Sequence, residues 1–94
     1  MSAVKGVPVR LSRKARLAFD PVRRQPMLLY PERGLALNPV AHAIVSLCDG
    51  SSDRAQIAQR IAERFPEAPP EAVKRDVATF LDELTRRGLL LEAV

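Results

Sequence analysis

The sequence is poor in the residue types that build most enzyme active sites. Its 94 residues include one cysteine, one histidine, four glycines and no tryptophan. One cysteine and one histidine are too few for the usual four-ligand zinc site. The glycines are scattered, so they form no glycine-rich loop for a phosphate group. These shortages predict that the chain is not an enzyme, has no catalytic or metal-binding residues, and carries no cofactor.

Long apolar runs are also missing. No stretch approaches the roughly 20 apolar residues of a transmembrane helix, and the first ten residues, MSAVKGVPVR, lack the apolar region of a signal peptide. Cys48 lies in an apolar helical pattern, where a free cysteine acts as a small core residue. We therefore expect a cytoplasmic protein with no membrane partner.

The positive charge is concentrated near the N-terminus. Residues 1–24 carry seven bases against Asp20, a net charge of +6, whereas residues 25–94 carry a net charge of −2. The first 15 residues are basic, contain Gly6 and Pro8, and show no sustained hydrophobic period. This pattern predicts a flexible basic arm over residues 1–15 and a single winged-helix-like, peptide-binding domain over residues 16–94.

Three short strands are expected at the start of this domain. Apolar residues alternate within residues 15–20, and residues 27–30 and 35–37 form two further apolar runs. Pro31 suits the second position of the turn between the last two strands. Gly34 is expected to supply the positive φ angle that such a turn usually needs.

Three helices are expected to follow. Asn38 and Pro39 mark the start of the first helix, and Gly50 is expected to close it. Residues 53–65 form the second helix, which opens on a capping-box pattern. Residues 71–87 form the third helix, and the final residues form a short extended tail on the core. The order predicts an α+β fold that is winged-helix-like, with an N-terminal three-stranded antiparallel sheet followed by a three-helix bundle.

The third strand has the properties of a docking edge. Residues 35–37 are apolar and carry no lysine to discourage pairing with another chain. A peptide can add to such an edge through main-chain hydrogen bonds, among them one from the Leu37 amide if that amide faces the free edge. The alternative is that Leu35 and Leu37 are core residues and that the arm or the tail covers the edge.

Two other classes of function stay open. Winged-helix domains often bind DNA through the third helix, but residues 71–87 hold four bases and four acids. This helix lacks the excess positive charge that phosphate binding requires, so a DNA-binding winged-helix regulator is an alternative that depends on the basic arm. A structural module whose edge strands pair with a second copy is the third possibility.

Three segments resemble a known family in their order and spacing: LLYPERGLALN at residues 28–38, LCDG at residues 47–50 and DVATFLDELTRRGLL at residues 76–90. The chain resembles the pyrroloquinoline quinone (PQQ) biosynthesis protein D family from about Leu11 to Leu91. Members of that family are peptide chaperones and the prototype of the recognition element for ribosomally synthesised and post-translationally modified peptides (RiPPs).

The resemblance implies a function and a site. It implies that the chain binds the ribosomal PQQ precursor peptide and presents it to a radical S-adenosylmethionine (SAM) enzyme that cross-links a Glu and a Tyr. With this function we expect no nucleic-acid partner. Because the apolar free edge could pair with a second copy, we expect a monomer or weak homodimer. The peptide is expected to join the third strand and to lie against the third helix. The residues implied are Leu35, Ala36 and Leu37 on the strand, and Val73, Asp76, Val77 and Phe80 on the helix.

Overall fold

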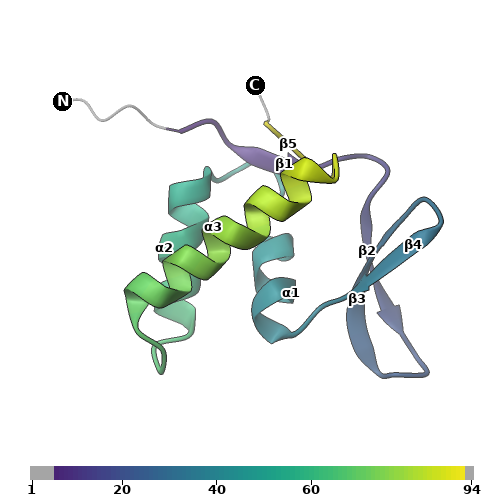
Figure 1. Cartoon of the computed structure of the whole chain (residues 1–94), viewed down its shortest axis with the longest axis horizontal. Helices are drawn as coiled ribbons and strands as arrows, with labels where there is room; N and C mark the ends of the chain where they lie inside the picture. Colours follow the sequence, from purple (N-terminus) through teal and green to yellow (C-terminus); the bar gives the residue numbers. More distant parts are fainter. Residues whose placement is uncertain (1–5, 93–94) are drawn as a thin grey trace.

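The computed structural model describes residues 6–92 and has the predicted α+β class (Figure 1). An antiparallel sheet precedes three helices, as expected, and a second, two-stranded sheet joins the two ends of the described chain. The elements are β1 (Val9–Leu11), β2 (Arg16–Asp20), β3 (Gln25–Tyr30), β4 (Arg33–Ala36), α1 (Pro39–Ser46), α2 (Arg54–Arg64), α3 (Pro70–Arg86) and β5 (Leu90–Glu92).

The larger sheet has the strand order β2-β3-β4, so β3 is its central strand. Leu28 in β3 lies opposite Leu17 in β2 and Leu35 in β4. Because side chains alternate between the faces of a strand, these three residues share one face. Leu28 is fully buried, so this face of the sheet is the one that closes the core. In Figure 1 the β2–β3–β4 sheet extends to one side of the helices.

The turn between β3 and β4 departs from the prediction. Tyr30 pairs with Arg33, which leaves Pro31 and Glu32 as the two turn residues. Glu32, and not Gly34, adopts the positive φ angle, at 61°. Proline at the first turn position and a left-handed residue at the second are the arrangement of a type II turn. A Cβ atom at Gly34 would lie 2.7 Å from the Met27 methyl carbon, so the flexible end of the Met27 side chain would have to shift.

The helices begin where the sequence predicts. The Asn38 side chain accepts a hydrogen bond from the Ala41 amide at the start of α1. Asp53 and Gln56 form a complete capping box at the start of α2. α1 ends at Ser46, earlier than the expected stop at residue 50. The core that the helices enclose is aliphatic, and its fully buried members include Ile57, Ile61, Val77, Leu81 and Leu84.

The end of α3 is fixed by a Schellman motif. The Gly88 amide donates to the Thr85 carbonyl, and the Leu89 amide donates to the Leu84 carbonyl. Gly88 adopts the positive φ angle, at 73°, that this motif needs. The motif leaves Arg87 at the last turn of α3 and directs the chain into the core at Leu89, which is buried.

The predicted arm over residues 1–15 is wrong for residues 9–15. β1 pairs with β5 on one side, and on the other its Val9 amide donates to the Ser52 carbonyl and its Leu11 amide to the Cys48 carbonyl. Val9 is only 1% exposed and Ala15 is also buried. An apolar residue at every second position, as at residues 7, 9 and 11, is the strand signal that the basic residues obscured. Residues 1–5 lie outside the described part of the chain.

Candidate functional site

β4 is an edge strand. It pairs with β3 on one side, and among residues 6–92 no other strand pairs with its second side. An edge of this kind presents unpaired amide and carbonyl groups to any extended chain that lies alongside. The tail and the β1 segment, which could have covered this edge, pair with each other instead.

The outward-facing groups of β4 follow from one hydrogen bond. The Leu37 amide donates to the Pro26 carbonyl over 3.0 Å, just beyond the end of β4. Main-chain groups in an antiparallel pair alternate between the two sides of a strand. In this register Leu35 therefore faces β3 with its amide and carbonyl, whereas Gly34 and Ala36 direct theirs to the free edge.

Leu37 does not have the position that the sequence predicted. Its amide bonds to Pro26 and its side chain is 2% exposed, so it is a core residue that anchors the end of β4. Leu35 is half-buried on the same face, and Ala36 is exposed. Of the three strand residues named by the sequence, Leu37 is thus buried in the core, Leu35 directs its side chain to the groove, and Ala36 directs its main chain to the free edge.

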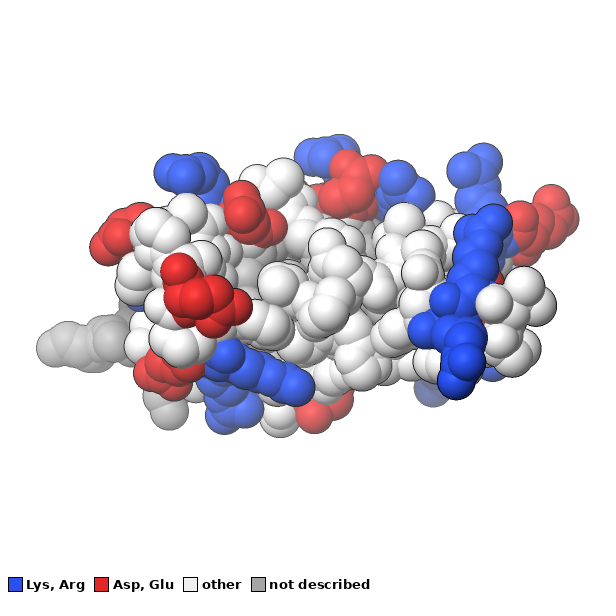
Figure 2. Space-filling model, turned by 90° about the horizontal axis from the view of Figure 1, so that it is seen from below, with Lys and Arg blue, Asp and Glu red and all other residues white. Residues whose placement is uncertain are grey.

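We use the word groove for the surface that runs beside β4 between two recesses, one between α1 and α3 and one at the β3–β4 turn. Asp76 and Phe80 of α3 line a small recess of about 140 Å³ together with residues of α1, among them Val40 and Ala41. Asp76 is exposed and Phe80 is half-buried. Seen from below, the surface around the start of α1 is uncharged across its middle (Figure 2). This end of the groove therefore offers apolar contacts.

Val73 and Val77 lie elsewhere. Val77 is fully buried and Val73 is 8% exposed, and both belong to the core beneath α3. Of the four helix residues named by the sequence, Asp76 and Phe80 reach the groove. The helical period explains the division, because residues 73, 77, 81 and 84 follow one stripe and residues 76 and 80 lie beside it.

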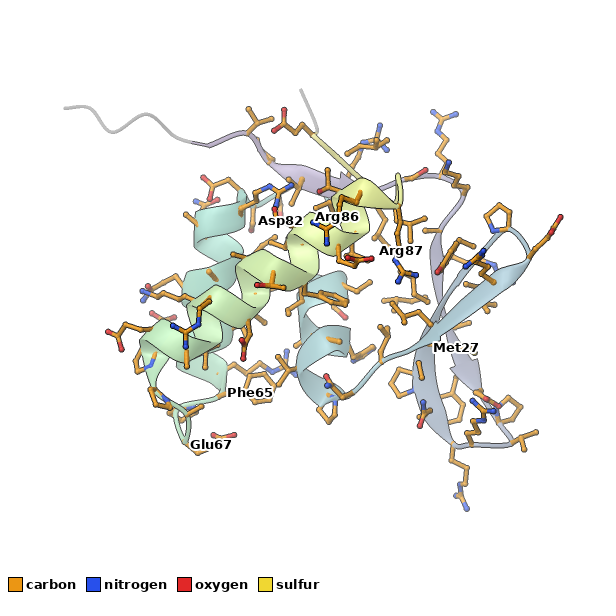
Figure 3. The ribbon with its side chains drawn as sticks, in the orientation of Figure 1. Met27, Phe65, Glu67, Asp82, Arg86 and Arg87 are labelled. Carbon is orange, nitrogen blue, oxygen red and sulfur yellow. The ribbon has the colours of Figure 1, made fainter. Side chains whose placement is uncertain are left out.

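The other end of the groove is basic. Tyr30, Arg33 and Arg87 line a recess of about 300 Å³ between the β3–β4 turn and the last turn of α3. Figure 3 shows the Arg87 side chain directed from α3 towards the β3–β4 hairpin. The Arg87 guanidinium donates to the Tyr30 hydroxyl over 2.8 Å and to the Glu83 carboxylate over 2.8 Å. The groove is thus bridged at this end by a side-chain contact between the sheet and α3.

Glu83 holds this arginine in place. Hydrogen bonds from Arg87 and Arg86 lower the pKa of the Glu83 carboxyl below its ordinary value of 4.5. The bonds to Glu83 and Tyr30 in turn raise the pKa of Arg87 above its ordinary value. Both groups are therefore charged at neutral pH. The Arg87 guanidinium is held by Glu83 on one side and by Tyr30 on the other.

Sequence reasoning missed Tyr30, Arg33 and Arg87 as groove residues. The signal that could have found Arg87 is its spacing, four residues after Glu83, which places the two side chains on one helix face. For Tyr30 and Arg33 the signal is their position at either side of the turn, where cross-strand partners meet. Their proximity to α3 depends on how the sheet docks on the helices, which no local pattern encodes.

The described residues contain little other chemistry. Burial raises the pKa of the Cys48 thiol to about 12, and the thiol donates to the Ile44 carbonyl, so Cys48 is a core residue as predicted. Among residues 6–92 no three His, Cys, Asp or Glu side chains come together as metal ligands. None of the helices in this part of the chain has the length and apolar character needed to span a bilayer.

The sequence is similar to those of known proteins over most of its length. The profile of the family described as coenzyme PQQ synthesis protein D (PqqD) matches residues 27–90. A protein of Rhizobium meliloti named PqqA binding protein is 46% identical over 82 residues, which cover 87% of this chain and 83% of that protein. A protein of the same name from Pseudomonas paraeruginosa is 40% identical over 82 residues, which cover 87% of this chain and 86% of that protein.

Two solved structures are also similar. The solution structure of the PqqD part of Methylobacterium extorquens PqqCD, described as a functional, stand-alone RiPP recognition element, has a TM-score of 0.70 and 36% identity. The match covers 89% of this chain and 88% of that one. The crystal structure of PqqD from Xanthomonas campestris has a TM-score of 0.53 and 34% identity, over 82% of this chain and 84% of that one.

Proposed function

Because the chain belongs to the coenzyme PQQ synthesis protein D (PqqD) family, we propose that it binds the ribosomal precursor peptide of PQQ by adding it as a strand to β4. Relatives that are 46% and 40% identical are named for binding PqqA. Binding, and not catalysis, is the proposed activity. A ribosomally made peptide first meets its partners where it is synthesised, so we place this step in the cytoplasm.

The observation that supports the proposal most is the free side of β4. Gly34 and Ala36 direct their amides and carbonyls outward on a strand that has a partner on one side only. Main-chain bonds to these groups would fix the register of a peptide, and side-chain contacts with the groove would select its sequence. Leu35 of β4 and Phe80 of α3 are half-buried, so a peptide that lay between them would complete their burial.

Strand addition suits a substrate that must react elsewhere. A disordered peptide loses conformational entropy when it binds, and only the residues held by β4 have to be ordered. The rest of the peptide stays free to enter the active site of a second protein. We propose that this second protein is a radical SAM enzyme that cross-links the Glu and Tyr of the precursor. Tethering would raise the concentration of the peptide near that enzyme without any catalytic residue in this chain.

A titration with fluorescein-labelled PqqA precursor peptide, followed by fluorescence anisotropy, tests the proposal. Saturable binding is expected for the native protein. Phe80→Ala should weaken it about tenfold, because Phe80 lines the groove. Phe65→Ala is the matched control: Phe65 is also half-buried against the core, but it lies at the end of α2, as Figure 3 shows. This control should leave the affinity within about twofold.

Two results would overturn the proposal. One is no saturable binding of the peptide, with or without the enzyme. The other is equal loss of affinity in Phe80→Ala and Phe65→Ala, because a common loss would come from general destabilisation. Strongly salt-dependent binding to duplex DNA in the absence of peptide binding would instead favour the DNA-binding regulator.

A further inference from the structure

The two ends of the groove beside β4 differ in chemistry. The end at the β3–β4 turn is lined by Tyr30, Arg33 and Arg87. The end at the start of α1 is lined by uncharged side chains and by one carboxylate, Asp76. A groove with unlike ends distinguishes a ligand from the same ligand turned end for end.

At the turn end of the groove, the positively charged side chains outnumber the negatively charged ones. A second recess, of about 470 Å³, adjoins the first at Tyr30 and Arg33 and adds Arg13, Lys14 and Arg16 to its lining. The two recesses together contain five bases, and the acids beside them are Glu32, in the turn, and Glu83, which pairs with Arg87. The net charge of this group is +3.

Arg33 is the base best placed to meet a ligand on β4. It is exposed at the first position of the strand, and among the described residues it forms no ion pair. Its side chain lies on the same face of β4 as Leu35, which is the face towards the groove. Arg87 is held opposite by Glu83 and Tyr30, so a carboxylate between the two arginines would meet one preorganised donor and one free donor.

At the α1 end a carboxylate would find no such partner. Val40, Ala41, Ile44 and Phe80 provide an apolar surface there, and the nearby charge of Asp76 would repel an acid. The surface in Figure 2 is also uncharged across its middle. An apolar side chain is the ligand group that gains most at this end, because its burial requires no hydrogen-bond partner.

The register of β4 sets the spacing between these two ligand groups. Arg33 and Leu35 lie on the groove side of β4. The core residue Leu37 follows at the same two-residue period just beyond the strand, so residues 33 and 37 are four positions apart. A peptide strand opposite them presents side chains to the groove at the same period of two residues. If the peptide continues the antiparallel order of the sheet, its N-terminal end lies beside Leu37 and its C-terminal end beside Arg33.

We infer that the groove selects a peptide in which an apolar residue is followed, four positions later, by an acidic residue whose carboxylate lies between Arg33 and Arg87. This inference rests on the proposed function, and it adds the direction of the peptide and two specificity-determining arginines. The charge at the turn end provides the acidic preference, and the recess at Phe80 provides the apolar one.

A double-mutant cycle tests the inference with the native protein, Arg33→Gln, and PqqA peptides in which each Asp or Glu is replaced singly by Asn or Gln. We expect one acidic replacement to weaken binding to the native protein about tenfold and binding to Arg33→Gln less than about twofold. Replacement by Ala of the apolar residue four positions earlier should show the same coupling to Phe80→Ala. Arg23→Gln, at an exposed position in the β2–β3 turn, is the matched charge control and should not couple.

The outcomes separate this inference from the proposed function. If the native protein binds no PqqA peptide, both fail. If it binds the peptide and every acidic replacement has the same effect on the native protein and on Arg33→Gln, the inference fails and the proposed function stands. Coupling to an acid that precedes the apolar residue would overturn the antiparallel direction.

Discussion

Two short strands of this protein, β1 and β4, differ in how many of their sides are hydrogen-bonded. β1 is bonded on both sides, to β5 and to the loop between α1 and α2, and its Val9 is 1% exposed. β4 is bonded on one side only, to β3, and its Ala36 is exposed. Strands of similar length therefore serve different purposes: β1 closes the core, and β4 leaves a hydrogen-bonding edge available.

The difference follows from what lies next to each strand. β1 meets the chain's own C-terminal strand, so an intramolecular partner uses its main-chain groups. Beyond β4 the chain enters α1, which forms with α3 the recess where Phe80 is half-buried. The main-chain groups on the outer side of β4 therefore stay free for an added strand.

The largest expected effect is on stability at β1. Val9→Asp places a carboxylate at a buried position, and we expect it to lower the free energy of unfolding by about 4 kcal/mol. Val22→Asp makes the same chemical change at a residue that is 88% exposed, and its effect should stay within about 0.5 kcal/mol. Urea denaturation followed by circular dichroism measures both. Equal stability of the two variants would show that β1 is the loose arm that composition suggests.

The second effect separates the two sides of β4. Leu37→Pro removes a buried leucine and the amide that bonds to Pro26, so the free energy of unfolding should fall by about 3 kcal/mol. Ala36→Pro removes an outward-facing amide, which an edge strand tolerates. It should leave the fold intact, as judged by circular dichroism, and weaken PqqA binding about tenfold. Unchanged affinity in a folded Ala36→Pro protein would contradict strand addition at this edge.

Some features of the fold could be predicted from the sequence alone, and others could not. Local chemistry identified the helix starts at Asn38 and Asp53, because each depends on a few adjacent residues. The role of β1 was missed because its partners, residues 48–52 and 90–92, are far away in the chain. Asp76 and Phe80 reach the groove for the same local reason that Val77 does not, which is the helical period.

The basic end of the groove could not be predicted from the sequence, because its residues are far apart in the chain. Arg33 and Arg87 are 54 positions apart in the sequence, and the recess that they share with Tyr30 exists only because the sheet packs beside α3. A charge count assigned the basic character to the N-terminal segment. In the structure Arg13, Lys14 and Arg16 of that segment line a recess together with Tyr30 and Arg33.

The smallest expected effect is a pH dependence at the contact between α3 and the sheet. The folded-state pKa of Glu83 is lowered, chiefly by the hydrogen bond from Arg87, so its contribution to stability is present above its ordinary pKa of 4.5 and is lost as pH falls through the lowered pKa. The difference in stability between the native protein and Glu83→Gln should therefore shrink between about pH 7 and about pH 3. Urea denaturation at both pH values measures it, and a difference that grows in acid would reverse the assigned sign.

The most direct test compares the two outer edges of the sheet by hydrogen exchange. The register directs the amides of Gly34 and Ala36 outward from β4, and those of Leu17 and Phe19 outward from β2. Amide exchange measured by NMR, with and without saturating PqqA peptide, reports which edge the peptide occupies. We predict that the peptide slows exchange at Gly34 and Ala36 and leaves it unchanged at Leu17 and Phe19. Slowing at Leu17 and Phe19 alone, or at neither pair while the peptide is bound, would contradict it.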